Sequence, residues 1–315
     1  MNPQNLTRRE LLRASGAASL AAALPFSLSA GQSQQTSAKK APPPAAVSNP
    51  LKPPAEGSIP VAFLLSDGAV VIDFAGPWEV FNNVMIGNRM DLFQTYTVSE
   101  SAKPVQASGG MQIVPNYTLA NAPQPKIIVI PAQGDPTQPM LDWIRNSSKL
   151  ADLTMSVCTG AFVLAQTGLL AGKSATTHHG SLMSLQIAYP DIHVKRGARF
   201  VEEGNLATAA GLSSGIDLAL HVVERYYGRD VATETAYNLE YQGQGWMNAN
   251  SNSAYAKLRG STAGHPRCPI CDMEVDSTDA LTTQYRGKTY RFCSAEHKQQ
   301  FDSQPQTIVD FLQQS

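Results

Sequence analysis

The sequence predicts an α/β sandwich around a mainly parallel sheet for residues 59–242. Short β-rich apolar runs alternate there with stretches of helical character, as in strands joined by helical crossovers. The runs Lys126–Ile130 and Leu153–Val157 show no polar alternation, which is expected of strands covered on both faces. In such sheets the functional residues follow the carboxyl ends of the strands, so those positions are the first candidates.

Each element of the main domain follows from its local pattern. Phe93–Val98 alternates as a half-buried strand does, and Pro77 suits the first position of a helix over Trp78–Val84. The expected strands are Ile59–Leu65, Phe93–Val98, Lys126–Ile130, Leu153–Val157 and Leu206–Ala209. The expected helices are Trp78–Val84, Met140–Ser147, Thr159–Thr167 and Ser213–Tyr227.

Composition bounds the domain plan and excludes two classes of partner. The 315 residues allow one large domain or two unequal ones. A net charge of −1, and of −5 over residues 59–315, argues against nucleic-acid binding. No apolar run reaches the ~20 residues of a membrane span. The expected segments are a signal peptide at 1–30, a Pro-rich linker at 31–58, the main domain at 59–242, a second linker at 243–264 and a small unit at 265–315.

The N-terminal residues have the character of an export signal. Arg8 and Arg9 precede Leu11 and Leu12, and a weakly apolar stretch, Ala14–Ala30, follows and ends in small residues. This order is typical of a signal peptide and resembles the twin-arginine type. It predicts a periplasmic or secreted protein with no stable membrane insertion after cleavage. The alternative is a disordered basic tail.

Cys158 lies at the carboxyl end of the predicted strand Leu153–Val157 and just before a helix. Gly160 and Ala161 supply the small residues that a sharp strand-to-helix turn needs. The N-terminus of the following helix is expected to stabilise a thiolate and to lower the pKa of the thiol. The pattern therefore predicts a nucleophile, with a buried structural cysteine as the alternative.

Three segments resemble the ThiJ/PfpI (DJ-one) superfamily, and its isonitrile-hydratase branch most of all. They read VIDFAGPWEVF at 71–81, SVCTGAFVLAQTGLLAGKSATTHH at 156–179 and ATAAGLSSGIDLALHVVERYYG at 207–228. The first is also similar to the glutamine amidotransferase-like domains of some AraC-type regulators. The resemblance implies a flavodoxin-like sandwich, often a homodimer, with no cofactor in this domain.

The resemblance also implies roles for particular residues. Cys158 matches the nucleophile, Asp73 matches a catalytic carboxylate that contacts the sulfur, and the backbone N–H of Thr159 helps to hold an oxyanion. His178 matches a histidine near the cysteine in several branches. Two alternatives stay open, because Asp73 suits a helix cap near Pro77 and His178 suits a hydrogen-bonded core position.

One loop departs from the family pattern. Gly134 lies where the family usually has Pro-Gly-Gly, but Ala132 and Gln133 replace the preceding glycines. Glycine permits a positive φ and a close approach of substrate to the backbone. Its replacement therefore affects the second backbone donor of the predicted oxyanion hole.

These features predict an exported, cysteine-dependent hydratase or hydrolase of small C–N compounds. In the expected reaction Cys158 attacks the electrophilic carbon of an isonitrile, Asp73 transfers protons, and an N-substituted formamide leaves. The alternative is a non-enzymatic periplasmic protein that binds metal or senses redox state through Cys158. The expected partner of the main domain is a small-molecule substrate.

The C-terminal unit has the spacing of a metal site. Cys268 and Cys271 form a C-x2-C pair, and Cys293 and His297 form a C-x3-H pair. Three thiolates and an imidazole suit a tetrahedral site, and the segment 266–312 resembles the YHS domain, a small metal-associated α+β module. Histidine favours zinc over copper. The alternative is a Cys268–Cys271 disulfide with a spare Cys293.

Overall fold

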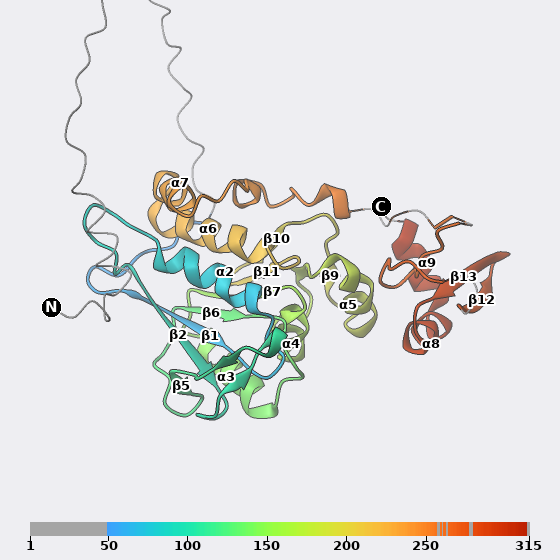
Figure 1. Ribbon diagram of the computed structural model, residues 1–315, viewed down its shortest axis with the longest axis horizontal. Coiled ribbons are helices and arrows are strands. Elements are labelled where there is room, and N and C mark those ends of the chain that lie inside the picture. Colours follow the sequence, from blue (N-terminus) through green and yellow to red (C-terminus); the bar gives the residue numbers. More distant parts are fainter. Residues whose placement is uncertain (1–48, 257–258, 260, 263, 277–279, 314–315) are drawn as a thin grey trace, which may run out of the picture. The chain divides into compact units, whose positions relative to one another are not determined.

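The computed structural model describes residues 49–256, 259, 261–262, 264–276 and 280–313 (Figure 1). The predicted signal peptide and most of the Pro-rich linker lie outside the described residues. Within the described part of the chain, no helix has the length and apolarity needed to cross a membrane.

A seven-stranded sheet forms the centre of the main domain, in the order β10-β11-β7-β6-β1-β2-β5. All neighbouring pairs are parallel except β10 and β11, which are antiparallel. In the same order the strands span Phe200–Glu203, Leu206–Ala209, Leu153–Val157, Ile127–Ile130, Ile59–Leu64, Phe93–Ser99 and Tyr117–Thr118. The carboxyl ends of the parallel strands therefore share one edge, where Cys158 follows β7.

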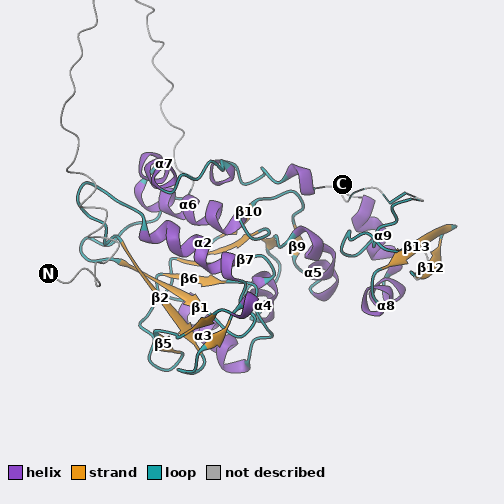
Figure 2. Ribbon diagram, in the orientation of Figure 1, coloured by secondary structure: helices purple, strands orange, loops and turns teal. Residues whose placement is uncertain are grey.

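Helices cover both faces of this sheet, as Figures 1 and 2 show. One face carries α2 (Val71–Asn82), α6 (Ser214–Tyr227) and α7 (Arg229–Asn238). The other face carries α3 (Gln138–Ser148) and α4 (Gly160–Gln166). The predicted α/β sandwich around a mainly parallel sheet is thus confirmed.

Alternate strand residues supply two separate hydrophobic cores. In β1, Val61 and Phe63 belong to the core under α2 and α6, whereas Ala62 and Leu64 belong to the core under α3 and α4. All four side chains are fully buried, because each face of the strand has its own helical cover. The remaining elements of this domain are β3 (Val105–Gln106), β4 (Gln112–Ile113), β8 (Ser174–Ala175), β9 (His193–Val194) and α5 (Leu182–Ala188).

The predicted strands lie within one residue of the observed ends, but the first predicted helix begins too late. Helix α2 starts at Val71 and contains Pro77 in its interior. Burial of Phe74 and Phe81 along one helix face stabilises the longer helix despite the N–H that proline lacks. Asp73 lies in the first turn, whereas the helix cap is Val70, so the capping interpretation of Asp73 is wrong.

The expected second linker is folded where the structure describes it. Residues 245–247 and 253–255 form short 3-10 turns. Trp246 is 3% exposed and belongs to the core that α6 covers. A composition rich in glycine, asparagine and serine predicted a linker, but the burial of one tryptophan fixes this segment on the main domain.

The C-terminal unit is a small α+β module. An antiparallel hairpin, β12 (Leu281–Tyr285) and β13 (Lys288–Phe292), is followed by α8 (Ala295–Ser303) and α9 (Pro305–Gln313). Its hydrophobic core centres on Phe301, whose ring packs on aromatic rings of both strands.

Candidate active site and metal site

Cys158 occupies a strained turn between β7 and α4. Its φ is 57°, in the left-handed region that L side chains rarely adopt. Gly160 makes the turn feasible, because a Cβ at that position would lie 2.3 Å from the carbonyl oxygen of Ile130. The sharp strand-to-helix turn predicted from the sequence is therefore present, and it places the thiol at the carboxyl edge of the sheet.

Asp73 is a buried carboxylate with few partners. Its exposure is 0%, and Oδ2 accepts a hydrogen bond from the Ala132 N–H at 3.1 Å. Oδ1 is buried and has no hydrogen-bond partner among the described residues. Burial raises the pKa of Asp73 to about 6, although the Ala132 N–H and the Cys158 thiol each lower it. Such a carboxyl group can take and return a proton near neutral pH.

The Cys158 thiol is protonated at rest, contrary to the sequence-based expectation. Burial and the negative charge of Asp73 raise its pKa to about 11, although hydrogen bonds from Leu212 and Thr159 lower it. The helix N-terminus was expected to lower this pKa, but the side chain is only 7% exposed. The loss of hydration and the neighbouring carboxylate raise the pKa of the thiol by more than the helix N-terminus lowers it.

The backbone N–H of Thr159, which was expected to help to hold an oxyanion, contacts the Cys158 sulfur in this structure. Both this N–H and the Thr159 hydroxyl hydrogen-bond to Cys158 and favour the thiolate. Thr177 and Leu212 were missed in the sequence. The Thr177 hydroxyl donates to the Cys158 carbonyl oxygen at 2.8 Å, and the Leu212 N–H donates to the sulfur. A backbone N–H carries no side-chain signal, so Leu212 could not be found from residue type.

His178 lies near this turn and is partly buried. Its Nδ1 accepts a hydrogen bond from the Gly180 N–H at 3.2 Å, and its ring lies 4.2 Å from that of His179. A Cβ on Gly211 would lie 2.5 Å from the His178 ring, so the ring packs directly on the loop that precedes Leu212. Burial lowers the pKa of His178, which keeps the imidazole neutral at pH 7.

The altered loop after β6 is held by hydrogen bonds. The Gly134 N–H donates to the carbonyl oxygen of Asp67 at 2.9 Å. The Gln133 side chain accepts hydrogen bonds from the backbone N–H and the hydroxyl of Ser66. The Gly134 N–H is therefore occupied, and this loop offers no second oxyanion donor at that position.

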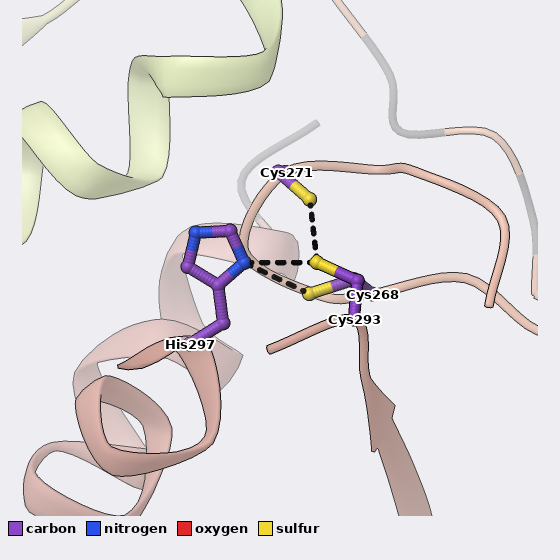
Figure 3. Close-up of side chains that lie close together, drawn as sticks. All are labelled: Cys268, Cys271, Cys293 and His297. Carbon is purple, nitrogen blue, oxygen red and sulfur yellow. Dashed lines mark hydrogen bonds between the residues drawn. The ribbon is translucent and has the colours of Figure 1, made fainter. Parts of the chain in front are cut away.

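The C-terminal cysteines and histidine converge on one point, as Figure 3 shows. The ligand atoms of Cys268, Cys271, Cys293 and His297 all lie within 4.8 Å of one another. His297 Nδ1 is 3.1 Å from the Cys293 sulfur and 3.6 Å from that of Cys268, and the Cys271 and Cys293 sulfurs are 3.5 Å apart. A tetrahedral zinc site has ligand atoms about 3.5–3.8 Å apart, so these residues fit the metal.

The local fold explains how these four ligands meet. Cys293 directly follows β13, and His297 lies in the first turn of α8. The Ser294 hydroxyl caps this helix by accepting the His297 N–H at 3.2 Å, which fixes the turn that separates the two ligands. All four cysteines of the chain are free thiols, so the Cys268–Cys271 disulfide is absent from this structure.

A cysteine on a strained strand-to-helix turn, beside a buried carboxylate at the edge of a parallel sheet, defines a class of α/β proteins with a candidate sulfur nucleophile. The sequence model described as "DJ-1/PfpI family" matches residues 60–225, more than half of the chain. The chain belongs to this family, and the flavodoxin-like fold that the resemblance implied is confirmed. The C-terminal unit lies outside the match.

Two curated relatives show the range of functions around this domain. Isonitrile hydratase of Pseudomonas putida is 34% identical over 195 residues, which cover 58% of this chain and 79% of that protein. The HTH-type transcriptional regulator GbdR of Pseudomonas aeruginosa is 26% identical over 186 residues. The chain spans only 50% of that regulator's length.

Solved structures agree with the fold. A ThiJ/PfpI family protein from Pseudomonas syringae is 27% identical with a TM-score of 0.53, and the match covers 60% of this chain and 77% of that chain. Drosophila melanogaster DJ-1beta is 21% identical with a TM-score of 0.52, and the match covers 59% of this chain and all of that chain. The second likeness supports the fold alone.

Proposed function

We propose that the main domain is a cysteine-dependent enzyme that hydrates small isonitriles or related C–N compounds. The observation that carries this proposal is the contact between the Cys158 thiol and the buried Asp73 carboxylate, whose Oδ1 has no other partner. A carboxylate oxygen that is free of other hydrogen bonds and lies next to a nucleophile is what proton transfer requires. The 34% identical isonitrile hydratase supports the same chemistry.

The reaction follows from the resting state of thiol and carboxylate. As the Cys158 sulfur attacks the terminal isonitrile carbon, its proton passes to Asp73. Asp73 then protonates that carbon and leaves a thioimidate. Asp73 next takes a proton from water as the water oxygen adds to the carbon, and this proton passes to nitrogen. Collapse of the tetrahedral adduct returns the sulfur and a proton to Cys158 and releases an N-substituted formamide.

Three further residues have supporting roles in this proposal. The Thr159 N–H and hydroxyl stabilise negative charge on the sulfur. His178, neutral at pH 7, lines the approach beside Gly211 and excludes water by its bulk. Gly134 shapes the loop that carries Ala132, whose N–H orients Asp73, but it donates its own N–H elsewhere.

The test is formamide production from simple alkyl and aryl isonitriles by the full chain, followed by nuclear magnetic resonance. Asp73→Asn keeps the size of the side chain and an acceptor for the Ala132 N–H. It should lower kcat/KM by at least about 10²-fold. Cys158→Ala should abolish turnover, and Asp191→Asn, at an exposed position, is the matched control with turnover unchanged. Near-normal activity in Asp73→Asn would disprove the proton-transfer role.

The C-terminal unit is proposed as a YHS-like metal-binding module that holds zinc in preference to copper. Cys268, Cys271, Cys293 and His297 would hold the ion, and the bound metal would supply folding stability. The distances between the ligand atoms support this proposal. Metal analysis of purified protein should give about one equivalent of zinc, and Cys271→Ser should lose most of it. Less than about 0.2 equivalents, with no uptake by the reduced protein, would end the metal proposal.

The metal cluster also supports the second candidate function, a non-enzymatic metal-binding or redox-sensing protein. In that case metal would pass stoichiometrically to a partner, and replacing Cys158 would have no effect. Turnover that depends on both Cys158 and Asp73 would decide for the enzyme. Export through the twin-arginine signal is also proposed. Fractionation of cells that express the full chain, compared with an Arg8→Lys, Arg9→Lys variant, tests it.

A further inference from the structure

The loop that donates to the Cys158 sulfur adopts an unfavourable backbone conformation. Leu212 has a φ of 41°, which is costly for a residue with a branched side chain. Its side chain is 40% exposed, so packing of this side chain does not hold the conformation. Its backbone N–H nevertheless reaches the sulfur and lowers the pKa of the thiol. Some other contact must stabilise this loop.

Arg199 makes hydrogen bonds to the chain on both sides of Leu212. Its carbonyl oxygen accepts the Ala210 N–H at 3.0 Å, and the Ala210 carbonyl oxygen accepts the Cys158 N–H at 2.9 Å. Its guanidinium Nη2 donates to the Ser213 hydroxyl at 3.0 Å. One residue thus anchors the chain two positions before and immediately after the strained position.

The contact with Ser213 replaces an ordinary helix cap. Ser213 is the N-cap residue of α6, a position where a serine hydroxyl usually accepts a backbone N–H from the first turn. Here the hydroxyl makes no capping hydrogen bond and accepts from Arg199 instead. Loss of this hydroxyl therefore removes the link to Arg199 without removing a cap.

Asp217 holds the guanidinium in place from the first turn of α6. It is 1% exposed, and its Oδ2 lies 2.5 Å from the Arg199 guanidinium. The Tyr241 hydroxyl donates to Oδ2 at 3.0 Å, and the Trp246 N–H donates to Oδ1 at 2.9 Å. Both carboxylate oxygens are engaged, and one of the contacts comes from Trp246, in the segment 243–264 that the sequence suggested was a linker.

We propose that Asp217, Arg199 and Ser213 are positioning residues that hold the Leu212 N–H on the Cys158 sulfur. This inference rests on the proposed role of Cys158 as a nucleophile and deepens it. The Leu212 N–H, held in this way, stabilises the anionic sulfur when its proton leaves. The three positioning residues therefore favour attack by the sulfur without contacting the substrate. This inference also assigns a role to the folded 241–252 segment, which fixes Asp217.

The experiment measures alkylation of Cys158 by iodoacetamide in the full chain from pH 7.5 to 10.5, resolved by peptide mass spectrometry. Ser213→Ala should displace the rising profile of alkylation rate against pH to higher pH. It should also slow alkylation at pH 8.5 by about tenfold, the effect of one hydrogen bond to a charged group. Ser213→Thr keeps the hydroxyl and should restore the rate. Peptides with Cys268, Cys271 and Cys293 are internal references.

Two controls distinguish the loss of positioning from general destabilisation of the fold and from the loss of a negative charge. Asn252→Ala removes another Arg199 contact, from Nη1 at 3.3 Å, and should change the rate less than about twofold. In Asp217→Asn, loss of a negative charge alone would lower the thiol pKa, whereas loss of positioning raises it, so the two causes differ in sign. The melting temperature of Ser213→Ala should stay within about 3 °C.

Unchanged alkylation in Ser213→Ala, or an equal effect in Asn252→Ala, would overturn the proposal. The ¹³Cβ shift of labelled Cys158 reads the protonation of the sulfur even if the reagent reacts slowly at this buried thiol. Neither measurement uses a substrate. A failure to hydrate isonitriles would therefore refute the proposed function and leave the positioning result standing.

Discussion

Asp73 and Asp217 are two buried carboxylates, each in the first turn of a helix, with very different surroundings. They are 0% and 1% exposed. Asp217 has an arginine, a tyrosine hydroxyl and a backbone N–H around its two oxygens. Asp73 has a backbone N–H on one oxygen and a neighbouring thiol, and within the described part of the chain it makes no contact with a positive charge.

The difference shows how partners, and not burial, separate a structural carboxylate from a reactive one. A buried carboxylate whose two oxygens are hydrogen-bonded fixes the surrounding chain. A buried charge with an unused oxygen is unstable as an anion, so its pKa rises toward the range where proton transfer is efficient. We propose that Asp73 exchanges a proton with Cys158, whereas Asp217 holds the loop that donates to its sulfur.

The largest expected effect is on folding. Asp217→Asn leaves the Arg199 guanidinium without its anion in a mostly buried place and should lower the free energy of unfolding by about 3–5 kcal/mol. Urea unfolding followed by tryptophan fluorescence measures this, because Trp246 packs beside the pair. A loss below about 1 kcal/mol would mean that the Arg199–Asp217 pair contributes no more to the free energy of unfolding than a surface ion pair does.

Asp73→Asn should have the opposite effect on stability. Raising the pKa of Asp73 from 3.8 to about 6 costs the ionised native state about 3 kcal/mol at neutral pH. The neutral amide avoids that cost, so the variant should unfold at higher urea concentration while it loses activity. If Asp73→Asn is less stable than the parent at pH 7.5, then the carboxylate has a stabilising partner in solution.

The pH dependence of that gain sharpens the comparison. The native state binds the Asp73 proton more tightly than the unfolded state, so the contribution of Asp73 to stability is lost as the pH rises from about 4 to about 6. The gap between parent and Asp73→Asn should therefore be full above pH 7 and close to zero near pH 4. We would compare unfolding midpoints of the two proteins at several pH values. A gap independent of pH would exclude ionisation as its cause.

The smallest effect is on the pH–rate profile. If the Asp73 carboxylate takes the thiol proton, kcat/KM should fall about tenfold per pH unit below about 6. Between pH 7 and 9 it should be nearly flat, because the thiol itself does not ionise there. A profile that instead rises steadily through pH 8.5 would indicate attack by a preformed thiolate, with no need for Asp73 as base.

Residue patterns alone predicted the mainly parallel sheet, the helices that cover it and the candidate thiol. Continuous apolar runs predict β6 and β7 because both faces of these strands are covered, and the small residues after Cys158 predict the sharp turn. The spacing of Cys268, Cys271, Cys293 and His297 likewise predicted their convergence, since short-range pairs need only a turn each.

Only the tertiary structure decided the protonation of Cys158 and the contacts of Asp217. A pKa depends on burial and on charges from distant segments, and Asp73 lies 85 positions before Cys158 in the chain. Arg199, Asp217 and Trp246 meet through the packing of β10, α6 and the segment after α7. No local pattern encodes such a meeting, because it results from the way the chain closes on itself.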